Sequence, residues 1–521
     1  MHARVSLAIR IAALSIGMVL SSALPARADV SLPSIIGNNM MLQQGQPVPI
    51  WGWAEPGEKV TVKIGEWQTQ TVAGTNGEWK VQVPKHDPGG PVAITIAGKN
   101  SITLTNVLFG EVWICSGQSN MGWGVGGSAS LNDMAKMNYP MIRQYCMHIH
   151  PTNVPQRNCI GSWRIATSNN VHEFCAVGFW FAEKVHQETK MPMGLLHAAY
   201  GSSSAETWTP RQALRDDPDF APMFERAKLA DMPALEAKYA VAMTNWEAQA
   251  QDAKKQNKPE PSKPQEPKDI HAYIMRHAPG NVFDGMIMPL VPFGIRGALW
   301  YQGEHNAPRA QQYRKVLPIL IRCWRAVWGQ GDFPFFIVQL PNTYHTPTEP
   351  RDSEWAEMRE TQAAVASSVS NCYMAVTIDT GDGTIHPVNK WDVGKRLALI
   401  ALDKVYGRKT ECYGPSFDSM TVKNGNVVVR FKNTDGGLMV GKDGTAKTIT
   451  GFAVAGEDRK FAWADAWIQK ETVVLSNATL RMPVAVRYAW GDNPACNLYN
   501  KAGLPAAPFR TDKWPGIATN L

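Results

Sequence analysis

The chain has 521 residues and a formal net charge of +7, with 44% hydrophobic and 19% charged residues. This length predicts two to four domains with ample hydrophobic cores. Lysines and arginines are spread along the chain without a basic block, so no nucleic-acid partner is expected.

Residues 1–28 have the features of a secretory signal peptide. Arg4 and Arg10 are basic, residues 11–20 are apolar, and a small-x-small cleavage motif precedes Asp29. The apolar stretch is too short to span a bilayer, and no second stretch of about 18 apolar residues follows, so no membrane span is expected. We therefore expect a secreted or periplasmic protein.

The next segment, residues 29–107, is expected to be a β-sandwich module. Apolar and polar residues alternate at 60–64 and 79–83, and Pro-Gly and Asn-Gly turns separate such runs. From residue 108 to 407 strand signals alternate with helical ones, and the spacing of apolar residues over 313–328 makes one helix face. This alternation predicts an α/β domain with a mainly parallel sheet.

An insertion at about residues 212–269 interrupts this α/β part. Its Ala, Glu and Lys content predicts helix, and residues 254–267 are typical of a charged, proline-rich linker. We expect a solvated surface segment, with a lid over the site as the alternative. Residues 408–521 return to β signals and are expected to form a second β module.

Eight cysteines form an even number, which allows one or more disulfides in an exported protein. Cys115 and Cys323 lie in apolar strand-like and helix-like contexts, which are typical of buried free thiols. The spacing of the cysteines assigns no pairing.

The most informative segment is 112–121, which reads VWICSGQSNM. An apolar run ends at Gly-Gln-Ser-Asn, and α/β enzymes place their chemistry at such strand ends. Ser119 then has the position of a serine nucleophile, although Ser and Asn are also ordinary helix caps. Because Met121 replaces the second glycine of the Gly-x-Ser-x-Gly elbow, the segment indicates a serine hydrolase other than the α/β-hydrolases.

Two further segments have the same character. Residues 298–306 (ALWYQGEHN) are an apolar strand ending in polar residues, and residues 379–387 (DTGDGTIHP) precede a helical stretch. Acyl transfer needs a nucleophile, a base, a group that orients the base and donors for the oxyanion. The three segments together contain candidates for all four roles.

These three motifs resemble the sialate O-acetylesterase family of SGNH-type hydrolases, and the tail from 486 to 512 is similar to the family's carboxy-terminal part. The resemblance spans nearly the whole mature chain. It implies a three-layer α/β/α core with a mainly parallel sheet, flanked by amino-terminal and carboxy-terminal β modules. It also implies a serine esterase that needs no metal and no organic cofactor.

His386 is the expected base, because it follows an Asp/Gly-rich loop, precedes a helix and matches the family's catalytic histidine. His305 adjoins Glu304, but the family usually has a small polar residue there, so His305 is expected to be substrate-facing or neutral. Many SGNH enzymes have Asp three residues before the histidine, where this chain has Gly383. Glu304 is slightly favoured as the orienting carboxylate over Asp382, and a plain Ser-His dyad stays open.

The oxyanion donors are expected to be the backbone N–H groups of Ser119 and Gly201 and a side-chain amide, either Gln302 or Asn306. Gly201 lies in a segment that resembles the family's second block. A neutral amide donates without a charge of its own.

The sequence therefore predicts a secreted serine esterase that removes O-acetyl groups from a sugar through an acetyl-Ser119 intermediate. The family name implies O-acetylated sialic acid, and acetylated plant or algal polysaccharide such as xylan or pectin is the alternative. Trp123, Trp208 and Trp300 lie beside the motifs, where they either stack on a sugar or pack in the core. A non-catalytic carbohydrate-binding protein and a serine peptidase or amidase are the alternatives from other classes, and no oligomeric state is indicated.

Overall fold

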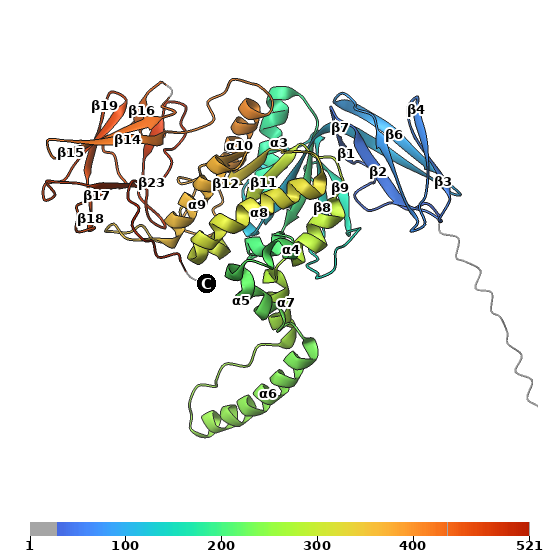
Figure 1. Ribbon diagram of the computed structural model, residues 1–521, viewed down its shortest axis with the longest axis horizontal. Helices are drawn as coiled ribbons and strands as arrows, with labels where there is room; N and C mark the ends of the chain where they lie inside the picture. Colours follow the sequence, from blue (N-terminus) through green and yellow to red (C-terminus); the bar gives the residue numbers. More distant parts are fainter. Residues whose placement is uncertain (1–28, 435, 520–521) are drawn as a thin grey trace, which may run out of the picture.

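The computed structural model describes residues 29–434 and 436–519. The expected signal peptide lies outside these ranges. Figure 1 shows the first strands at one end of the molecule, strands and helices mixed in the middle, and the last strands at the other end.

The amino-terminal strands alternate between buried and exposed residues, as the sequence predicts. In β3 the side chains of Val60, Val62 and Ile64 are buried and those between them are more exposed. β3 pairs antiparallel with β4 and β6, and β2 pairs antiparallel with β5. The bounds are β1 Met41–Gln43, β2 Val48–Trp53, β3 Lys59–Ile64, β4 Trp67–Val72, β5 Glu78–Val83 and β6 Gly89–Ala97.

One long strand, β7 (Ser101–Gly117), connects this region with the middle of the molecule. Its first half pairs antiparallel with β6, and its second half pairs parallel with β10 and β11. The expected boundary at residue 107 therefore falls inside a continuous strand. The two regions share backbone hydrogen bonds through this strand instead of a flexible linker.

The central part of the sheet has the order β13-β12-β11-β7-β10-β8-β9. Neighbours from β13 to β8 are parallel, and β9 joins antiparallel. Since the antiparallel amino-terminal strands continue the sheet through β7, the complete sheet is mixed and the fold is mixed α/β. The remaining bounds are β8 Tyr139–Met147, β9 Gly161–Ala166, β10 Met193–Ala199, β11 Gly297–Tyr301, β12 Phe335–Val338 and β13 Cys372–Ala375.

Helices cover both faces of this central part. Ile114 and Ala298 pack in one core cluster with Leu317 of α8, whereas Cys115 and Leu299 pack in a second cluster with residues of α3 and α10. Successive strand residues point to opposite faces, which is why neighbours in sequence join different clusters. The bounds are α3 Ala176–Thr189, α8 Ala310–Trp328, α9 Glu354–Ser368 and α10 Lys390–Lys404.

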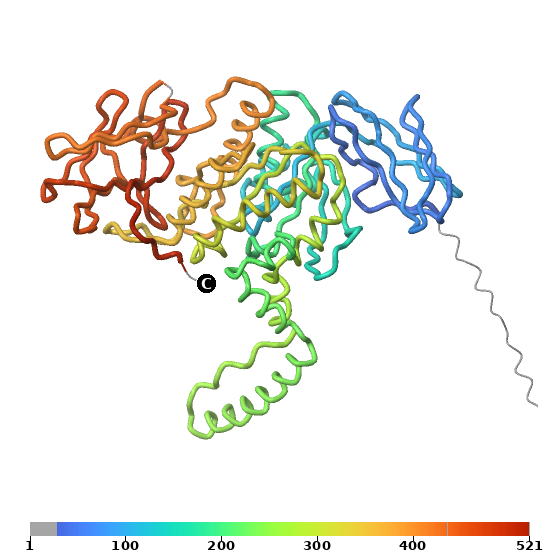
Figure 2. Tube along the Cα trace, in the orientation of Figure 1, coloured from blue at the N-terminus to red at the C-terminus, as the bar shows by residue number. Residues whose placement is uncertain are grey.

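The segment expected to be an insertion includes α5 and α6 and overlaps α4 and α7 at its two ends, and α6 projects from the molecule. Figures 1 and 2 show α6 and the coil after it extending away from the sheet and its helices. Leu235 is the only buried residue in α6, and the Trp246 indole donates to Pro261 O at 2.8 Å across the loop. The bounds are α4 Arg211–Leu214, α5 Ala221–Ala227, α6 Met232–Lys255 and α7 Pro267–His277.

The last strands form small antiparallel sheets around a third core cluster. The buried guanidinium of Arg359, on α9, donates to Gly491 O at 2.6 Å and to Asp492 O at 2.9 Å, which fixes this region to the middle of the molecule. The bounds are β14 Ser416–Lys423, β15 Asn426–Lys432, β16 Leu438–Val440, β17 Phe452–Ala455, β18 Phe461–Trp463, β19 Asp465–Gln469, β20 Thr472–Ser476, β21 Ala485–Tyr488, β22 Leu498–Asn500 and β23 Phe509–Arg510.

All eight cysteines are free thiols in the structure, so the disulfides that an even number allows are not formed. Cys115 is fully buried, as expected, whereas Cys323 is only half-buried. Within residues 29–434 and 436–519, no helix has the length and apolar character that a bilayer crossing requires.

Candidate active site

Three neighbouring parallel strands end at the same edge of the sheet. Gly117 at the end of β7 lies opposite Ala199 of β10 and Tyr301 of β11. Each strand is followed by one of the polar segments that the sequence singled out. The register therefore brings the residues after these three strands together at the carboxyl edge, where α/β folds bind their ligands.

The turn that carries the candidate nucleophile depends on Gly117. Its φ is +136°, and a Cβ there would lie 2.1 Å from Tyr301 O, so only glycine fits. Gln118 N–H donates to Tyr301 O at 3.0 Å, and the short helix α1 (Ser119–Gly122) starts directly afterwards. This geometry ends the strand and leaves Ser119 half-buried at the edge.

Ser119 and His386 are brought together across 267 residues of sequence. His386 Nε2 lies 2.8 Å from Ser119 Oγ. The imidazole stacks on the Trp123 indole, with 5.3 Å between ring centroids. Burial and the charge of Lys390 lower the pKa of His386, so the imidazole is neutral and ready to accept a proton at neutral pH.

Asn120 connects the serine turn with the histidine turn. Its amide Nδ2 donates to Ile385 O at 3.0 Å and to Glu304 Oε1 at 2.5 Å. Its Oδ1 accepts from Lys390 Nζ at 2.7 Å, and Lys390 Nζ also donates to Pro387 O at 2.5 Å. One buried network thus connects the residue after Ser119 with the residues on both sides of His386.

Burial affects the two charged members of this network in opposite directions. It lowers the pKa of Lys390 to about 8, because a fully buried ammonium loses its hydration. Burial raises the pKa of Glu304, because a buried carboxylate also loses its hydration, although the hydrogen bond from Asn120 opposes this shift. No separate role was expected for Asn120 or Lys390, although Asn120 lies in the segment 112–121 and Lys390 follows the segment 379–387 by three residues.

Neither candidate carboxylate is hydrogen-bonded to His386 among the described residues. Glu304 bonds to Asn120 instead, and its Oε2 has no hydrogen-bond partner there. Asp382 accepts from the Thr384 hydroxyl at 2.7 Å and from Val388 N–H at 3.1 Å, so it shapes the loop. Gly383 has a φ of +86°, a conformation that disfavours the aspartate of many SGNH enzymes at this position.

The expected oxyanion donors divide into two groups. A Cβ on Gly201 would lie 3.6 Å from Ser119 Cβ, so the Gly201 backbone lies beside the candidate nucleophile. In the described part of the chain, no acceptor is hydrogen-bonded to the N–H of Ser119 or of Gly201. These two backbone groups are free to face a ligand.

The two side-chain amides are engaged elsewhere. Gln302 Nε2 donates to Ser203 O at 3.1 Å and to Asn306 Oδ1 at 2.8 Å. Asn306 Nδ2 contacts both oxygens of Glu206, at 3.1 and 3.2 Å. Both side chains are fully buried and both amide nitrogens donate within the protein, so the structure does not present them as free donors beside Ser119. Only the Gln302 oxygen, an acceptor, has no partner among the described residues.

Two of the three tryptophans beside the motifs belong to the core. Trp208 and Trp300 are fully buried and pack edge to face, with ring centroids 5.8 Å apart. Trp123 alone of the three is half-buried and lies against His386. It is therefore the one of these rings that can contact a sugar at the site.

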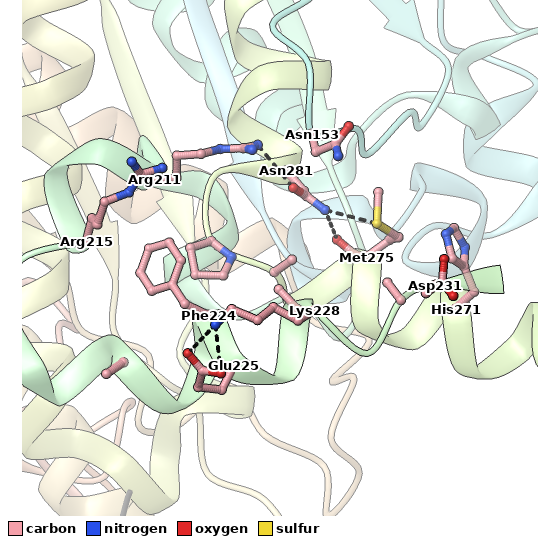
Figure 3. A pocket seen from close by; sticks show the side chains of 15 residues that line it. Asn153, Arg211, Arg215, Phe224, Glu225, Lys228, Asp231, His271, Met275 and Asn281 are labelled. Atoms are coloured by element: carbon pink, nitrogen blue, oxygen red, sulfur yellow. Dashed lines mark hydrogen bonds and ion pairs between the residues drawn. The ribbon is translucent and has the colours of Figure 1, made fainter. Parts of the chain in front are cut away.

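A cavity of about 830 Å³ lies apart from these residues, between α4, α5 and α7 (Figure 3). Its charged groups are mostly paired within the protein: Arg211 donates to Asn281, and Lys228 pairs with Glu225 at 2.7 Å. None of the residues expected at the catalytic site lines it. The cavity is therefore separate from the residues gathered at the strand ends.

Comparisons with known proteins agree on one family. Residues 109–255 and 281–402, more than half of the chain, match the family described as "Carbohydrate esterase, sialic acid-specific acetylesterase". The sialate O-acetylesterase of Rattus norvegicus is 28% identical over 528 residues, covering 91% of this chain and 93% of the relative. The Homo sapiens sialate O-acetylesterase is 27% identical over 573 residues, covering 97% and 99%. A crystal structure of a carbohydrate acetylesterase from Xanthomonas citri is 32% identical, covers 93% of this chain and 100% of that chain, and has a TM-score of 0.78.

Proposed function

The chain belongs to the carbohydrate esterase family of sialic acid-specific acetylesterases and is a carboxylic ester hydrolase, and we propose that it removes O-acetyl groups from sialic acids through an acetyl-Ser119 intermediate. The observation that carries this proposal is the distance of 2.8 Å between Ser119 Oγ and His386 Nε2 at the sheet edge. A neutral imidazole at that distance accepts the proton of an attacking hydroxyl.

The reaction proceeds in two halves. Ser119 Oγ attacks the acetyl carbonyl while His386 takes its proton, and the N–H groups of Ser119 and Gly201 stabilise the oxyanion. The tetrahedral intermediate then collapses, the bond to the sugar oxygen breaks, and His386 returns the proton to that oxygen. Water activated by the same imidazole finally hydrolyses the acetyl ester and releases acetate.

Glu304, Asn120 and Lys390 act as positioning residues in this mechanism. Asn120 holds the backbone before His386 through Ile385 O, and Glu304 fixes the Asn120 amide from the other side. We therefore favour Glu304 over Asp382 as the carboxylate that orients the base, although it acts through Asn120 and not by direct contact.

We also propose that the central region is an SGNH-hydrolase-like α/β/α core flanked by two β modules. Support comes from helices on both faces of the parallel strands and from the strand-only regions at the two ends. We propose export as well, on the basis of the first 28 residues of the sequence. Sequencing the amino terminus of the exported protein checks this, and a start near Asp29 is expected.

The test compares acetate release from O-acetylated sialic acid, acetylated xylan and acetylated pectin by the wild type and Ser119→Ala. We expect sialic acid to be the best substrate and Ser119→Ala to lose at least about 10³-fold in kcat, because only the oxyanion donors remain. Ser367→Ala, an exposed serine on α9, is the matched control. Ser119→Ala with more than a few per cent of wild-type activity contradicts the nucleophile, and faster release from a polysaccharide contradicts the substrate.

A further inference from the structure

Helix α7 reaches the candidate active site from the insertion. The Arg276 guanidinium lies over the Tyr200 ring, 4.7 Å from its centroid. The next residue, His277, stacks on His305 with 4.1 Å between centroids and 15° between planes. Tyr200 precedes Gly201, and His305 follows Glu304. The end of α7 therefore borders two of the three strand ends that form the site.

Several polar atoms at this end of α7 are buried without a hydrogen-bond partner among the described residues. They are both ring nitrogens of His277 and the Nε of Arg276. The His277 side chain is 7% exposed, so solvent does not replace the missing partners freely. A buried polar group without a partner costs roughly 1–3 kcal/mol, and a bound ligand is one explanation for such a group.

The surroundings of the stacked histidines carry an excess of positive charge. Burial, together with the neighbouring His305 and the charges of Arg276, Arg309 and Arg226, lowers the pKa of His277 to about 3. Burial and the same arginines lower the pKa of His305, so both imidazoles are neutral.

Only one of these three arginines has a carboxylate partner in the described part of the chain. Arg309 pairs with Glu206 at 2.8 Å, whereas Arg226 and Arg276 form no ion pair there. A guanidinium without a counter-charge, beside two neutral imidazoles, is suited to a ligand that brings a negative charge of its own.

Arg276 and His277 lie outside the residues that match the family. The family match covers 109–255 and 281–402, so residues 256–280, which include α7, are not part of it. Ser119 and Glu304 lie inside the matched ranges. The candidate catalytic residues thus lie in the part of the chain that matches the family, whereas Arg276, one of the two unpaired arginines, lies in a segment outside it.

We propose that Arg276 binds the carboxylate of an acidic sugar whose O-acetyl group reacts at Ser119, with the ring nitrogens of His277 completing the polar contacts. The proposal rests on the proposed esterase function and makes α7 the element that selects sugar acids over neutral sugars. The planar guanidinium suits a carboxylate, because two parallel N–H groups meet its two oxygens. Sialic acids and uronic acids both carry this group, so the test includes both.

The experiment compares two substrates that differ only in the carboxylate. Acetate release is measured for O-acetylated N-acetylneuraminic acid and for its carboxyl methyl ester, and then for an O-acetylated galacturonide and its methyl ester. We expect Arg276→Gln to lower the acid-to-ester ratio of kcat/KM by about tenfold to a hundredfold, mainly through KM. Arg276→Lys keeps the positive charge, so we expect its acid-to-ester ratio to lie between those of the wild type and Arg276→Gln. Arg430→Gln, the same change at an exposed position of β15, leaves the ratio unchanged.

An unchanged acid-to-ester ratio in Arg276→Gln overturns the proposal, and an equal loss with both members of each pair then indicates a structural role for Arg276. The pair with the larger effect identifies the kind of sugar acid. A wild type that releases no acetate from any of these sugars contradicts the proposed function instead. In that case the affinities of Ser119→Ala and of the double variant Ser119→Ala/Arg276→Gln are compared for galacturonic acid and for galactose. A carboxylate site at Arg276 makes Ser119→Ala bind galacturonic acid more tightly than galactose, and the double variant loses this preference.

Discussion

The edge of the sheet and the end of α7 meet at the same site, but they differ in how their polar groups are satisfied. At the edge, Asn120 makes hydrogen bonds with both its oxygen and its amide, and Lys390 is held by two acceptors. At the end of α7, His277 has no partner at either ring nitrogen among the described residues. Asn120 and Lys390 are thus satisfied without a ligand, although one oxygen of Glu304 beside them is not, whereas the His277 ring is satisfied at neither nitrogen.

This difference separates two tasks of an esterase site. A closed network fixes the distance between nucleophile and base, since each member is held by the others. An open set of donors and acceptors keeps its binding capacity for the substrate. Substitutions in the closed network of Asn120, Glu304 and Lys390 should therefore lower kcat. Substitutions in the open set at the end of α7 should change which substrate is preferred.

The two carboxylates near the base are expected to give the largest effect on the closed network. We expect Glu304→Gln to lower kcat by about 10²-fold, because the buried charge that holds Asn120 and balances Lys390 is lost. Asp382→Asn should cost less than about tenfold, because Asp382 only shapes the loop through Thr384 and Val388. The measurement is kcat for an acetyl ester at neutral pH, with native folding checked by circular dichroism.

Other results of that pair of variants are equally informative. A large loss only at Asp382 overturns the preference for Glu304. Small losses at both indicate a Ser119–His386 dyad oriented without a carboxylate. Large losses at both indicate one shared network, in which case the double variant should lose less than the product of the two single effects.

Lys390 tests whether the closed network also sets the pH range of the enzyme. Its charge is one of two causes that lower the pKa of His386, so Lys390→Met should raise that pKa toward its ordinary value. The base works only when neutral, and activity is lost as pH falls through its pKa. The acid limb of kcat/KM should therefore move to higher pH, together with a loss of about tenfold to 10²-fold at pH 7.

Two controls keep this prediction interpretable. Lys390→Gln retains a donor without the charge, so it should shift the acid limb with a smaller loss in kcat. Lys404→Met removes an exposed charge at the end of the same helix and should leave the profile unchanged. An acid limb that stays in place in both Lys390 variants contradicts the electrostatic role of Lys390.

The comparison also shows which parts of the molecule could be predicted from sequence. The ends of the strands could be predicted, because their features are local in the sequence. Gly117 stands where the backbone admits only glycine, and the polar turn with Ser119 follows it directly. The resemblance to a known family then placed His386 opposite Ser119. The alternation of β3 was likewise a local signal that the structure repeats.

Contacts between distant segments could not be predicted in this way. Asn120 and Lys390 are 270 residues apart, and their hydrogen bond depends on how α10 packs on the sheet. Gln302 and Asn306 have the right chemistry for oxyanion donors, but Ser203 and Glu206 take their amide hydrogens once the chain folds. The domain boundary expected at residue 107 was also wrong, because it falls inside β7, whose pairing with distant strands continues across that residue.

The smallest effect is expected at the tip of the insertion, where the structure distinguishes a solvated segment from a lid. Residues 246 and 261 are joined by the Trp246–Pro261 hydrogen bond, so replacing residues 247–260 with a short Gly-Ser link keeps both ends in place. Because α6 buries little and projects away from the sheet, the free energy of unfolding should change by less than about 1 kcal/mol. The acid-to-ester ratio of kcat/KM should stay within about twofold of the wild type, since ordinary surface changes have effects of that size. A tenfold loss of activity would instead make α6 part of a lid, and a changed ratio would mean that the tip and the end of α7 act as one binding element.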